Sequence, residues 1–550
     1  MRGRMFLPLL ACLLACPRAR EPTARVEQPK VVVALVVDQL AAWIAAERLP
    51  LLPATGGFAR LRREGTWVRE MRYAHAVTDT APGHAALFTG KPPRESGIVA
   101  NERLALGRPI PFLRDEATKL VGDVVTETPG SSAAALRAPT VADRLRAAHP
   151  KATIVSLSIK DRGAIFGGGK APTATLWFDA GLDRFVTSTA FASSVPPWAA
   201  PYASHDAVVA ARKSRWEILD EAFVKAHATG DDAIGEGDWE GLGATFPHDV
   251  SAAKKPAVAF RATPFADEAV LALAAAAVRA RDAAEPMLLS VSLSANDYVN
   301  HVFGPDSWEA WDDLVRLDGA LARFFAVLDH EVGAGGWALV AAGDHGGPPL
   351  PEQKTRPWCA GADRWQRPCG GGRRITGEEV VAALEPAAAE VVGPGHWIDG
   401  VIDPYVILSK SARDLDPTRR EKLNVALSAR LAQIDGIASI HLVSKPAACP
   451  AEADESVEAL VCRSIGDDSP GDLYVVTRPG AFFDVGYVVG KGQSHGTPWL
   501  YDRTVPLLAR GPGVRRALVV EGPVSFTAYA RTLSTLLGLP ADPGFDAARP

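Results

Sequence analysis

The sequence predicts an α/β fold, with a doubly wound, mostly parallel sheet and a small α+β subdomain inserted late in the chain. Four short apolar runs have the composition of buried parallel strands. Helical patterns lie between them, and such alternation builds an open sheet covered by helices on both faces. With 550 residues, of which 47% are hydrophobic, the chain is long enough to bury a large core.

The predicted strands are rich in Val, Leu, Ala and Ser and span residues 30–37, 152–159, 287–294 and 336–343. A helical pattern precedes each of the last three strands, over residues 140–148, 267–283 and 311–329. We interpret residues 28–550 as one domain built on this sheet.

Two segments interrupt the alternation. Residues 185–265 are rich in Trp, Pro, Gly and Asp, and we interpret them as a long insertion that covers or borders the functional site. Residues 404–480 give a strand–helix–strand pattern followed by another strand, which predicts the inserted α+β subdomain.

Residues 1–16 are typical of a secretory signal. A basic start is followed by an apolar run, residues 5–16, that is too short to span a bilayer. "LLAC" occurs twice, and the second copy resembles a lipoprotein cleavage box that would place a lipid anchor on Cys16. Plain signal cleavage is the alternative, because Leu14 is a mediocre match to such a box. We expect export to the periplasm or the outer envelope, and no transmembrane helix elsewhere.

Four cysteines remain outside the signal, and they fall in two close pairs within loop-like sequence. An even count in an exported chain predicts two disulfides, Cys359–Cys369 and Cys449–Cys462. Four cysteines allow three pairings. A zinc–thiolate site is the alternative, but no C-x-x-C spacing supports it.

The stretch "TDTAPGHAALFTG" predicts a short helix that ends before Gly90. Pro82 suits the first helical position, and Gly90 suits the position just past the end. Thr80 would then lie at the helix N-terminus, where free N–H groups and the helix dipole attract anions. Alternatively, Thr78 or Thr80 only caps the helix.

Each predicted strand is followed directly by charged or histidine side chains: Asp38, then Lys160 and Arg162, then Asp297 and His301, then Asp344 and His345. Each group alone could be a cap, a turn or a surface pair. Ligands bind at the carboxyl ends of strands in open α/β sheets, so the recurrence indicates one site at that edge.

Three aspartates and two histidines are ligands for Zn²⁺ more than for Mn²⁺ or Mg²⁺, and they are too many for one tetrahedral ion. A two-metal cluster needs more nitrogen, and His495 in "GQSHGTPW" is the candidate. His84 lies inside the Thr80 helix and is expected to brace that loop. His75, His248 and His396 have no partner at ligand spacing.

Together the motifs occur in the order D, T-x-P-G-H, K-x-R, D-x-x-x-H-x-x-G-P, D-H-G and H-G-T. This order resembles the alkaline phosphatase superfamily. The chain is most similar to the bacterial phosphate-irrepressible (PafA-type) alkaline phosphatases, relatives of the nucleotide pyrophosphatase/phosphodiesterases. The resemblance runs from about residue 30 to about residue 539, and implies that residues 28–550 form an alkaline-phosphatase-like catalytic domain.

The resemblance implies two Zn²⁺ per chain, with Thr80 as nucleophile and bridging ligand. One ion would be held by Asp297, His301 and His495, and the other by Asp38, Asp344 and His345. Phosphoryl oxygens would be bound by Asn101 and by the cations Lys160 and Arg162. The departures from the family pattern, at Asp79, Ala81 and Glu102, bear on substrate access and remove no ligand.

The expected function is that of a metal-dependent phosphate monoesterase, an alkaline phosphatase that forms a phospho-threonine intermediate. A phosphodiesterase or nucleotide pyrophosphatase is the alternative, and Lys160 and Arg162 argue against it, because a diester has replaced one charged oxygen by an ester group. A sulfatase would need a C/S-x-P-x-R motif, and a phosphoethanolamine transferase would need transmembrane helices. A non-catalytic zinc- or phosphate-binding protein is the rival from another class.

The net charge of −5 gives no basis for nucleic-acid binding. The expected partners are small-molecule phosphate monoesters, and the expected oligomeric state is a monomer.

Overall fold

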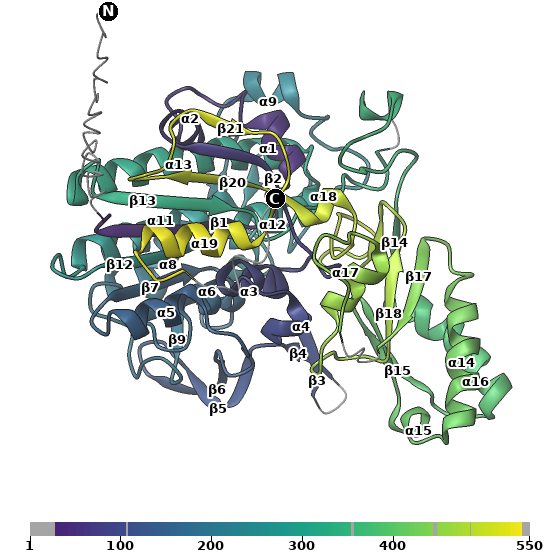
Figure 1. Ribbon diagram of the computed structural model, residues 1–550. Coiled ribbons are helices and arrows are strands. Elements are labelled where there is room, and N and C mark those ends of the chain that lie inside the picture. The colour runs from purple at the N-terminus through teal and green to yellow at the C-terminus, as the bar shows by residue number, and fades with distance from the viewer. Residues whose placement is uncertain (1–27, 106–107, 354–356, 444–447, 485, 542–550) are drawn as a thin grey trace, which may run out of the picture.

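The computed structural model describes residues 28–105, 108–353, 357–443, 448–484 and 486–541 (Figure 1). Its main feature is a 12-stranded mixed sheet in the order β21-β2-β20-β13-β1-β12-β7-β8-β9-β5-β6, with β22 paired to β2. Residues 1–27, which include the predicted signal and Cys16, lie outside the described part.

The centre of the sheet is parallel, as the sequence predicts. β1 (Val31–Val37) pairs parallel with β12 (Met287–Leu293) on one side and with β13 (Trp337–Ala342) on the other. β7 (Thr153–Ser158) continues the parallel order beyond β12. Nearly every residue of these strands is buried, which is why they read as continuous apolar runs.

The outer strands are mostly antiparallel, so the sheet is mixed. β20 (Thr504–Arg510) runs antiparallel to β13, and β2 (Thr66–Arg72) runs antiparallel to β20. The remaining strands of this sheet are β5 (Arg114–Val121), β6 (Val125–Ser131), β8 (Ala174–Asp179), β9 (Arg184–Ser188), β21 (Leu518–Val520) and β22 (Val524–Ser525).

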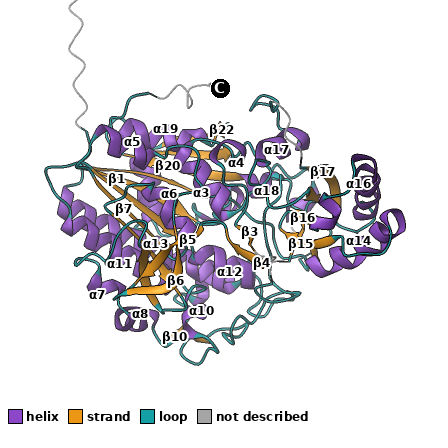
Figure 2. Ribbon diagram, turned by 90° about the horizontal axis from the view of Figure 1, so that it is seen from below, coloured by secondary structure: helices purple, strands orange, loops and turns teal. Residues whose placement is uncertain are grey.

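Helices cover both faces of the sheet (Figure 2). Val31, Val33 and Leu35 of β1 enter one apolar core and the alternating residues enter another, because successive side chains of a strand point to opposite faces. The first core is shared with α1 (Ala42–Arg48), α2 (Gly57–Glu64), α11 (Pro264–Ala280), α12 (Ala295–Phe303) and α13 (Trp308–Val332). The second is shared with α3 (Thr80–Thr89), α5 (Val141–Ala148), α6 (Asp161–Gly168) and α19 (Thr527–Leu536).

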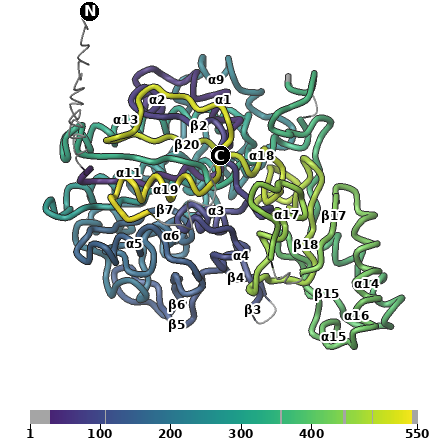
Figure 3. Tube along the Cα trace, in the orientation of Figure 1, coloured from purple at the N-terminus to yellow at the C-terminus, as the bar shows by residue number. Residues whose placement is uncertain are grey.

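The C-terminal helix lies beside the early part of the chain. Phe88 of α3 contacts Tyr529 of α19 with ring centroids 5.7 Å apart, and the Cα trace shows the yellow helix next to the purple and blue segments (Figure 3). The hydroxyl of Tyr529 donates a hydrogen bond of 3.2 Å to the carbonyl of Leu35 in β1. Helix α3, predicted near residue 80, therefore packs against α19 within the second core.

A smaller α+β unit lies to the right of the sheet in Figure 1. Its four antiparallel strands are β15 (Ile398–Ile402), β16 (Tyr405–Leu408), β18 (Leu473–Thr477) and β17 (Ile437–Leu442), in that spatial order. Helices α14 (Gly377–Val392) and α16 (Pro417–Leu431) share its separate core. This unit begins before residue 404, because α14 and β15 belong to it.

The region of the predicted insertion consists of short elements. They are α7 (Ala200–Ala203), α8 (His205–Arg212), α9 (Glu221–His227), α10 (Pro256–Phe260) and the ribbon β10 (Arg215–Trp216) with β11 (His248–Asp249). The other short elements are α4 (Pro93–Ser96), β3 (Glu102–Ala105), β4 (Arg108–Pro111), η1 (Pro357–Ala360), β14 (Arg373–Ile375), α15 (Lys410–Arg413), α17 (Val457–Ser464), β19 (Ala481–Phe483) and α18 (Leu500–Arg503).

Both predicted disulfides are confirmed, Cys359 with Cys369 and Cys449 with Cys462. Among the described residues, none of the helices has the length and apolar character needed to cross a membrane.

Candidate metal centre

Three neighbouring parallel strands deliver acids and histidines to one edge of the sheet. Asp38 directly follows β1, and Asp344 and His345 follow β13. β12 leads into α12, on which Asp297 and His301 lie one turn apart, with Oδ1 of Asp297 3.2 Å from Nε2 of His301. The predicted convergence of these residues is therefore present in the structure.

The potential metal-ligating atoms form two overlapping groups. Asp38, Asp344 and His345 offer atoms that all lie within 4.8 Å of one another, and so do Asp297, His345 and His495. Nε2 of His301 lies 3.2 Å from Nε2 of His495, so it adjoins the second group. The sequence-derived ligand sets thus come together, except that His345 takes part in both groups.

The three histidines are held with the same ring nitrogen facing the cluster. Nδ1 of His301 lies 2.7 Å from the carbonyl of Gln493, and Nδ1 of His345 lies 2.9 Å from that of Gly346. Nδ1 of His495 lies 2.9 Å from the carbonyl oxygen of Thr78. A carbonyl only accepts, so each Nδ1 must carry the proton in the neutral ring, and each Nε2 then offers a lone pair. This is the arrangement that metal-binding histidines require.

Within the described part of the chain, several buried polar atoms at the cluster make no hydrogen bond of normal geometry, although charged or imidazole groups lie near them. They include Oδ1 of Asp38, Oδ2 of Asp344 and Nε2 of His345, all on fully buried side chains. Buried polar groups are otherwise nearly always paired. Hard carboxylate oxygens and imidazole nitrogens suit Zn²⁺, so the residues present fit the predicted metal.

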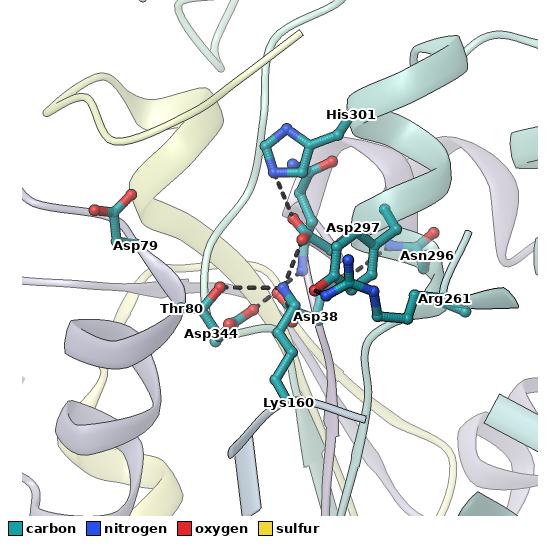
Figure 4. A network of polar contacts seen from close by, with 12 residues as sticks. Asp38, Asp79, Thr80, Lys160, Arg261, Asn296, Asp297, His301 and Asp344 are labelled. Atoms are coloured by element: carbon teal, nitrogen blue, oxygen red, sulfur yellow. Dashed lines mark hydrogen bonds and ion pairs between the residues drawn. The ribbon is translucent and has the colours of Figure 1, made fainter. Parts of the chain in front are cut away.

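Lys160 lies between the carboxylates of Asp38 and Asp297 on one side and Thr80 on the other (Figure 4). Its ammonium group is 2.7 Å from Oδ2 of Asp38, 2.6 Å from Oδ2 of Asp297 and 3.3 Å from the hydroxyl of Thr80. Burial alone would lower the pKa of Lys160, but Asp297 and Asp38 outweigh burial and hold the pKa above its ordinary value. Lys160 is thus a permanent cation beside the predicted nucleophile.

Thr80 is the first residue of α3, so the helix begins two residues earlier than the sequence predicted. Asp79 occupies the N-cap position without a side-chain cap, and Gly90 ends the helix with φ 65°. In the first turn, the N–H of Ala81 donates to Asn101, that of Gly83 donates to the carbonyl of Asp79, and Pro82 has none. This leaves the N–H of Thr80, whose side chain is almost fully buried, to meet an anion. The hydroxyl of Thr78 is used elsewhere, donating to the carbonyl of Thr497 at 2.9 Å.

Gly83 and His84 hold α3 against the loop that contains Asp344. A Cβ on Gly83 would lie 2.3 Å from the carbonyl oxygen of Asp344, so only glycine lets the helix approach this loop. Nδ1 of His84 lies 3.0 Å from Oδ2 of Asp344, and Nε2 lies 2.8 Å from the hydroxyl of Ser292. His84 is a brace, as expected.

Asn101 and Arg162 lie near the start of α3. Oδ1 of Asn101 accepts a hydrogen bond of 2.8 Å from the backbone N–H of Ala81, which leaves the amide nitrogen as its free donor. Arg162 lies in the first turn of α6, and Lys160 is the N-cap residue of the same helix. Both Asn101 and Arg162 line the cavity in front of Thr80.

Trp239, in the region of the predicted insertion, packs against two tyrosines at the site, Tyr298 and Tyr487. The ring of Tyr298, next to Asp297, stacks on Trp239 with centroids 5.4 Å apart and lies 4.9 Å from the ammonium of Lys160. Arg261 donates to its hydroxyl at 3.3 Å. Trp239 and Arg261 carry no motif, so the sequence did not single them out.

A cavity of about 400 Å³ opens in front of Thr80. One wall contains predicted site residues: Thr80, Asn101, Arg162, Asp297, His301 and His495. The opposite wall contains Glu102, Pro111, Gly377, Val401, Ile402, Asp403, Phe483, Asp484 and Tyr487, of which the sequence singled out Glu102 alone. Most of these come from the smaller unit and its connections, where no spacing in the sequence marks them.

A family model described as type I phosphodiesterase/nucleotide pyrophosphatase matches residues 32–455. The chain is 28% identical to alkaline phosphatase PafA of Elizabethkingia meningoseptica, over 94% of this chain and 93% of that protein. It is 33% identical to alkaline phosphatase PhoV of Synechococcus elongatus, over 59% of this chain and 60% of that protein.

Two solved structures of alkaline phosphatase PafA are similar to the model, each with a TM-score of 0.80 and 25% identity. The wild-type structure covers 94% of this chain and 97% of its own. The other, covering 95% and 98%, is a variant with a threonine, an asparagine, a lysine and an arginine substituted, in that order along its chain. Murine ectonucleotide pyrophosphatase/phosphodiesterase 5 shares the fold with a TM-score of 0.51 at 14% identity, over 94% of this chain and 96% of its own.

Proposed function

The chain belongs to the type I phosphodiesterase/nucleotide pyrophosphatase family of the alkaline phosphatase superfamily, and we propose that it is an alkaline phosphatase acting on phosphate monoesters at a two-zinc site. The observation that carries this proposal is the placement of Thr80 at a helix N-terminus, 3.3 Å from the ammonium group of Lys160, which itself contacts the cluster of metal-ligand type. The named phosphatases among its relatives support the reaction class.

In this proposal, Asp297, His301 and His495 hold one Zn²⁺, and Asp38, Asp344, His345 and Thr80 hold the other. The overlapping ligand groups around His345 support a cluster of two ions rather than one. When bound, the two ions would lower the pKa of the Thr80 hydroxyl and neutralise charge on the leaving oxygen. The backbone carbonyls that fix the three imidazole rings keep this cluster preorganised.

The hydroxyl of Thr80 attacks phosphorus in line with the leaving alcohol. The new bond joins Oγ1 to phosphorus and the bond from phosphorus to the alcohol oxygen breaks, while the hydroxyl proton passes to solvent and the departing alcohol oxygen takes a proton from solvent. A water oxygen then bonds to phosphorus, the bond between phosphorus and Oγ1 breaks, and Oγ1 regains a proton as inorganic phosphate leaves. The residue's place at the start of α3 favours this reaction, because the N–H of Thr80 and the dipole of α3 stabilise the transferred phosphoryl group.

Asn101 and the two cations bind the remaining phosphoryl oxygens. The amide of Asn101 is already oriented by Ala81, so its Nδ2 donates to the phosphoryl group without reorganisation. Lys160 and Arg162 pair with the charges that a monoester dianion carries and a diester lacks. The PafA variant supports these assignments, because its substituted residue types are those of Thr80, Asn101, Lys160 and Arg162.

A phosphodiesterase is the second candidate, favoured by the description of the matching family model. The buried cation beside Thr80 argues against it, because a diester would place an uncharged ester group near Lys160. The expected substrates are thus small-molecule phosphate monoesters. The proposed oligomeric state is a monomer.

Export to the periplasm or the outer envelope is part of the proposal. The two disulfides support it, since such bonds persist in oxidising compartments. A diacylglyceryl mass on Cys16 of envelope-derived protein would establish the lipid anchor, and a mature chain beginning beyond residue 16 would exclude it.

The test is a rate panel on purified protein with p-nitrophenyl phosphate, bis-p-nitrophenyl phosphate and p-nitrophenyl sulfate. We expect the monoester to react fastest, with all activity lost on chelation and regained with Zn²⁺. Faster turnover of the diester would establish the diesterase instead, and no turnover of any ester would favour a non-catalytic binding protein.

A further inference from the structure

The wall of the cavity opposite Thr80 has no role in the proposed chemistry. It includes Glu102 and Pro111 from the β3–β4 hairpin, which lies beside β15 in both ribbon views (Figures 1 and 2). The rest comes from the smaller α+β unit and the segment that follows β18. A cavity of about 400 Å³ is of the size that encloses small organic ligands, so it holds more than the phosphoryl group alone. The alcohol of a monoester must therefore contact this wall.

The wall is acidic. Glu102, Asp403 and Asp484 line it, and Asp79 lines the adjoining floor. Among the described residues that line this cavity, Arg162 is the only lysine or arginine, and in the proposed function it pairs with the phosphoryl group. The lining of the cavity thus has more carboxylates, including Glu102, Asp403 and Asp484, than lysines and arginines.

Two of these carboxylates converge. Oδ2 of Asp403 and Oδ1 of Asp79 each lie 3.3 Å from the point that a Cβ on Gly496 would occupy. Oδ1 of Asp79 also lies 3.3 Å from Nδ1 of His495. Asp484 accepts backbone hydrogen bonds from Gly486 and Gly490, which hold its carboxylate in place.

Aromatic rings complete the wall. Phe483 and Tyr487 both line the cavity, and the ring of Tyr487 packs against His301 with centroids 4.8 Å apart. Carboxylates beside aromatic rings bind amines and quaternary ammonium groups through charge and cation–π attraction. They repel a second anionic group.

We propose that Glu102, Asp403, Asp484, Phe483 and Tyr487 form a leaving-group pocket that selects phosphate monoesters of amino alcohols over monoesters with a second anionic group. This inference rests on the proposed phosphatase function. It gives a role to Glu102, which departs from the family pattern directly after Asn101.

The test compares three small monoesters of similar size: O-phosphoethanolamine, propyl phosphate and phosphoglycolate, whose alcohols are cationic, neutral and anionic. We expect kcat/KM to fall in that order, by about tenfold at each step in dilute buffer. The steps should shrink with added salt, because the charges at the cavity mouth are screened.

The double variant Glu102→Gln with Asp403→Asn should reduce the cation-to-anion ratio of kcat/KM at least tenfold. Glu102→Gln alone should reduce it less and is expected to fold normally, because this side chain is exposed. The matched control is Glu116→Gln, which removes the same charge from an exposed residue paired with Arg114, outside the cavity, and should leave the ratio unchanged.

Equal kcat/KM for the three substrates in the native protein, or a ratio that the double variant does not change, would overturn the leaving-group pocket while leaving the phosphatase intact. No turnover of these substrates or of p-nitrophenyl phosphate would overturn the proposed function, and this inference with it.

Discussion

The side chain of Asn101 accepts a hydrogen bond of 2.8 Å from the backbone N–H of Ala81, the residue that follows Thr80. This contact joins the β3–β4 region to the start of α3. It fixes the direction of the Asn101 amide relative to the Thr80 hydroxyl, and both groups face the same cavity. The predicted nucleophile and its oxygen-binding partner are therefore one preorganised unit.

Thr80→Ala should abolish formation of the phospho-enzyme and lower kcat by about 10³-fold or more, because no hydroxyl remains to attack phosphorus. Intact-protein mass spectrometry after acid quench would detect the phosphoryl adduct in the native protein only. Thr80→Ser keeps a hydroxyl and should retain the adduct. Unchanged turnover in Thr80→Ala would rule out Thr80 as the nucleophile.

Removal of both cations, Lys160→Ala with Arg162→Ala, should separate the two ester classes. Each charge-assisted contact contributes about 2–3 kcal/mol, so monoester kcat/KM should fall by about one to two decades per residue. Diester kcat/KM should change little. Lys151→Ala, an exposed residue outside the cavity, is the control. A parallel fall for both substrates would mean that the pair is structural.

The purified chain should contain two zinc ions by elemental analysis. Chelation should lower the midpoint of thermal unfolding as well as the activity, because metal that binds only the folded state stabilises it. His345→Ala should lose zinc, since His345 belongs to both ligand groups. His396→Ala, an exposed histidine beside Glu385 and Asp399, should not. A single tightly bound ion in the fully active protein would contradict the two-metal assignment.

Asp318 should make the protein less stable as the pH rises. Burial raises the pKa of its carboxyl to about 6, although backbone N–H groups of Phe58 and Gly57 oppose the shift. The folded state therefore binds the proton more tightly than the unfolded state. The resulting stabilisation is complete below about pH 4 and is lost as the pH rises through 6.

Asp318→Asn keeps an acceptor for these N–H groups and removes the titration. It should raise the free energy of unfolding at pH 8 by about 1–3 kcal/mol relative to the native protein, and by much less at pH 4. Urea unfolding at the two pH values measures this difference. An equal effect at both values would show that the carboxyl does not titrate in this range.

The fold and the convergence of the candidate metal-ligating residues could be predicted because each depends on local sequence. Continuous apolar runs mark the central strands, and the residues that follow them are fixed at the sheet edge by the parallel pairing of β1, β12 and β13. The helix at Thr80 was placed correctly at its C-terminal end, where Gly90 leaves little choice. Its start was misplaced because Pro82 is also tolerated at the third helical position.

The opposite wall of the cavity could not be predicted, because it depends on how two separately cored units pack. Asp403 follows an ordinary strand, and Tyr487 lies in a loop without periodicity. Gly83 approaches the backbone of Asp344 so closely that no Cβ fits there. Such contacts join residues far apart in the chain, and one sequence contains no signal for them.

Each of the three predicted histidine ligands has a backbone carbonyl beside its Nδ1. A carbonyl survives substitution of its own side chain, so the orientation of His301 and His495 should tolerate mutation at Gln493 and Thr78 as long as the backbone keeps its path. The wall that faces the alcohol is made of side chains and has no such protection. Among related chains, the reaction can therefore stay the same while point mutations change the substrate preference. Laboratory evolution aimed at Glu102, Asp403 and Tyr487 should likewise find new preferences without changes to the catalytic residues.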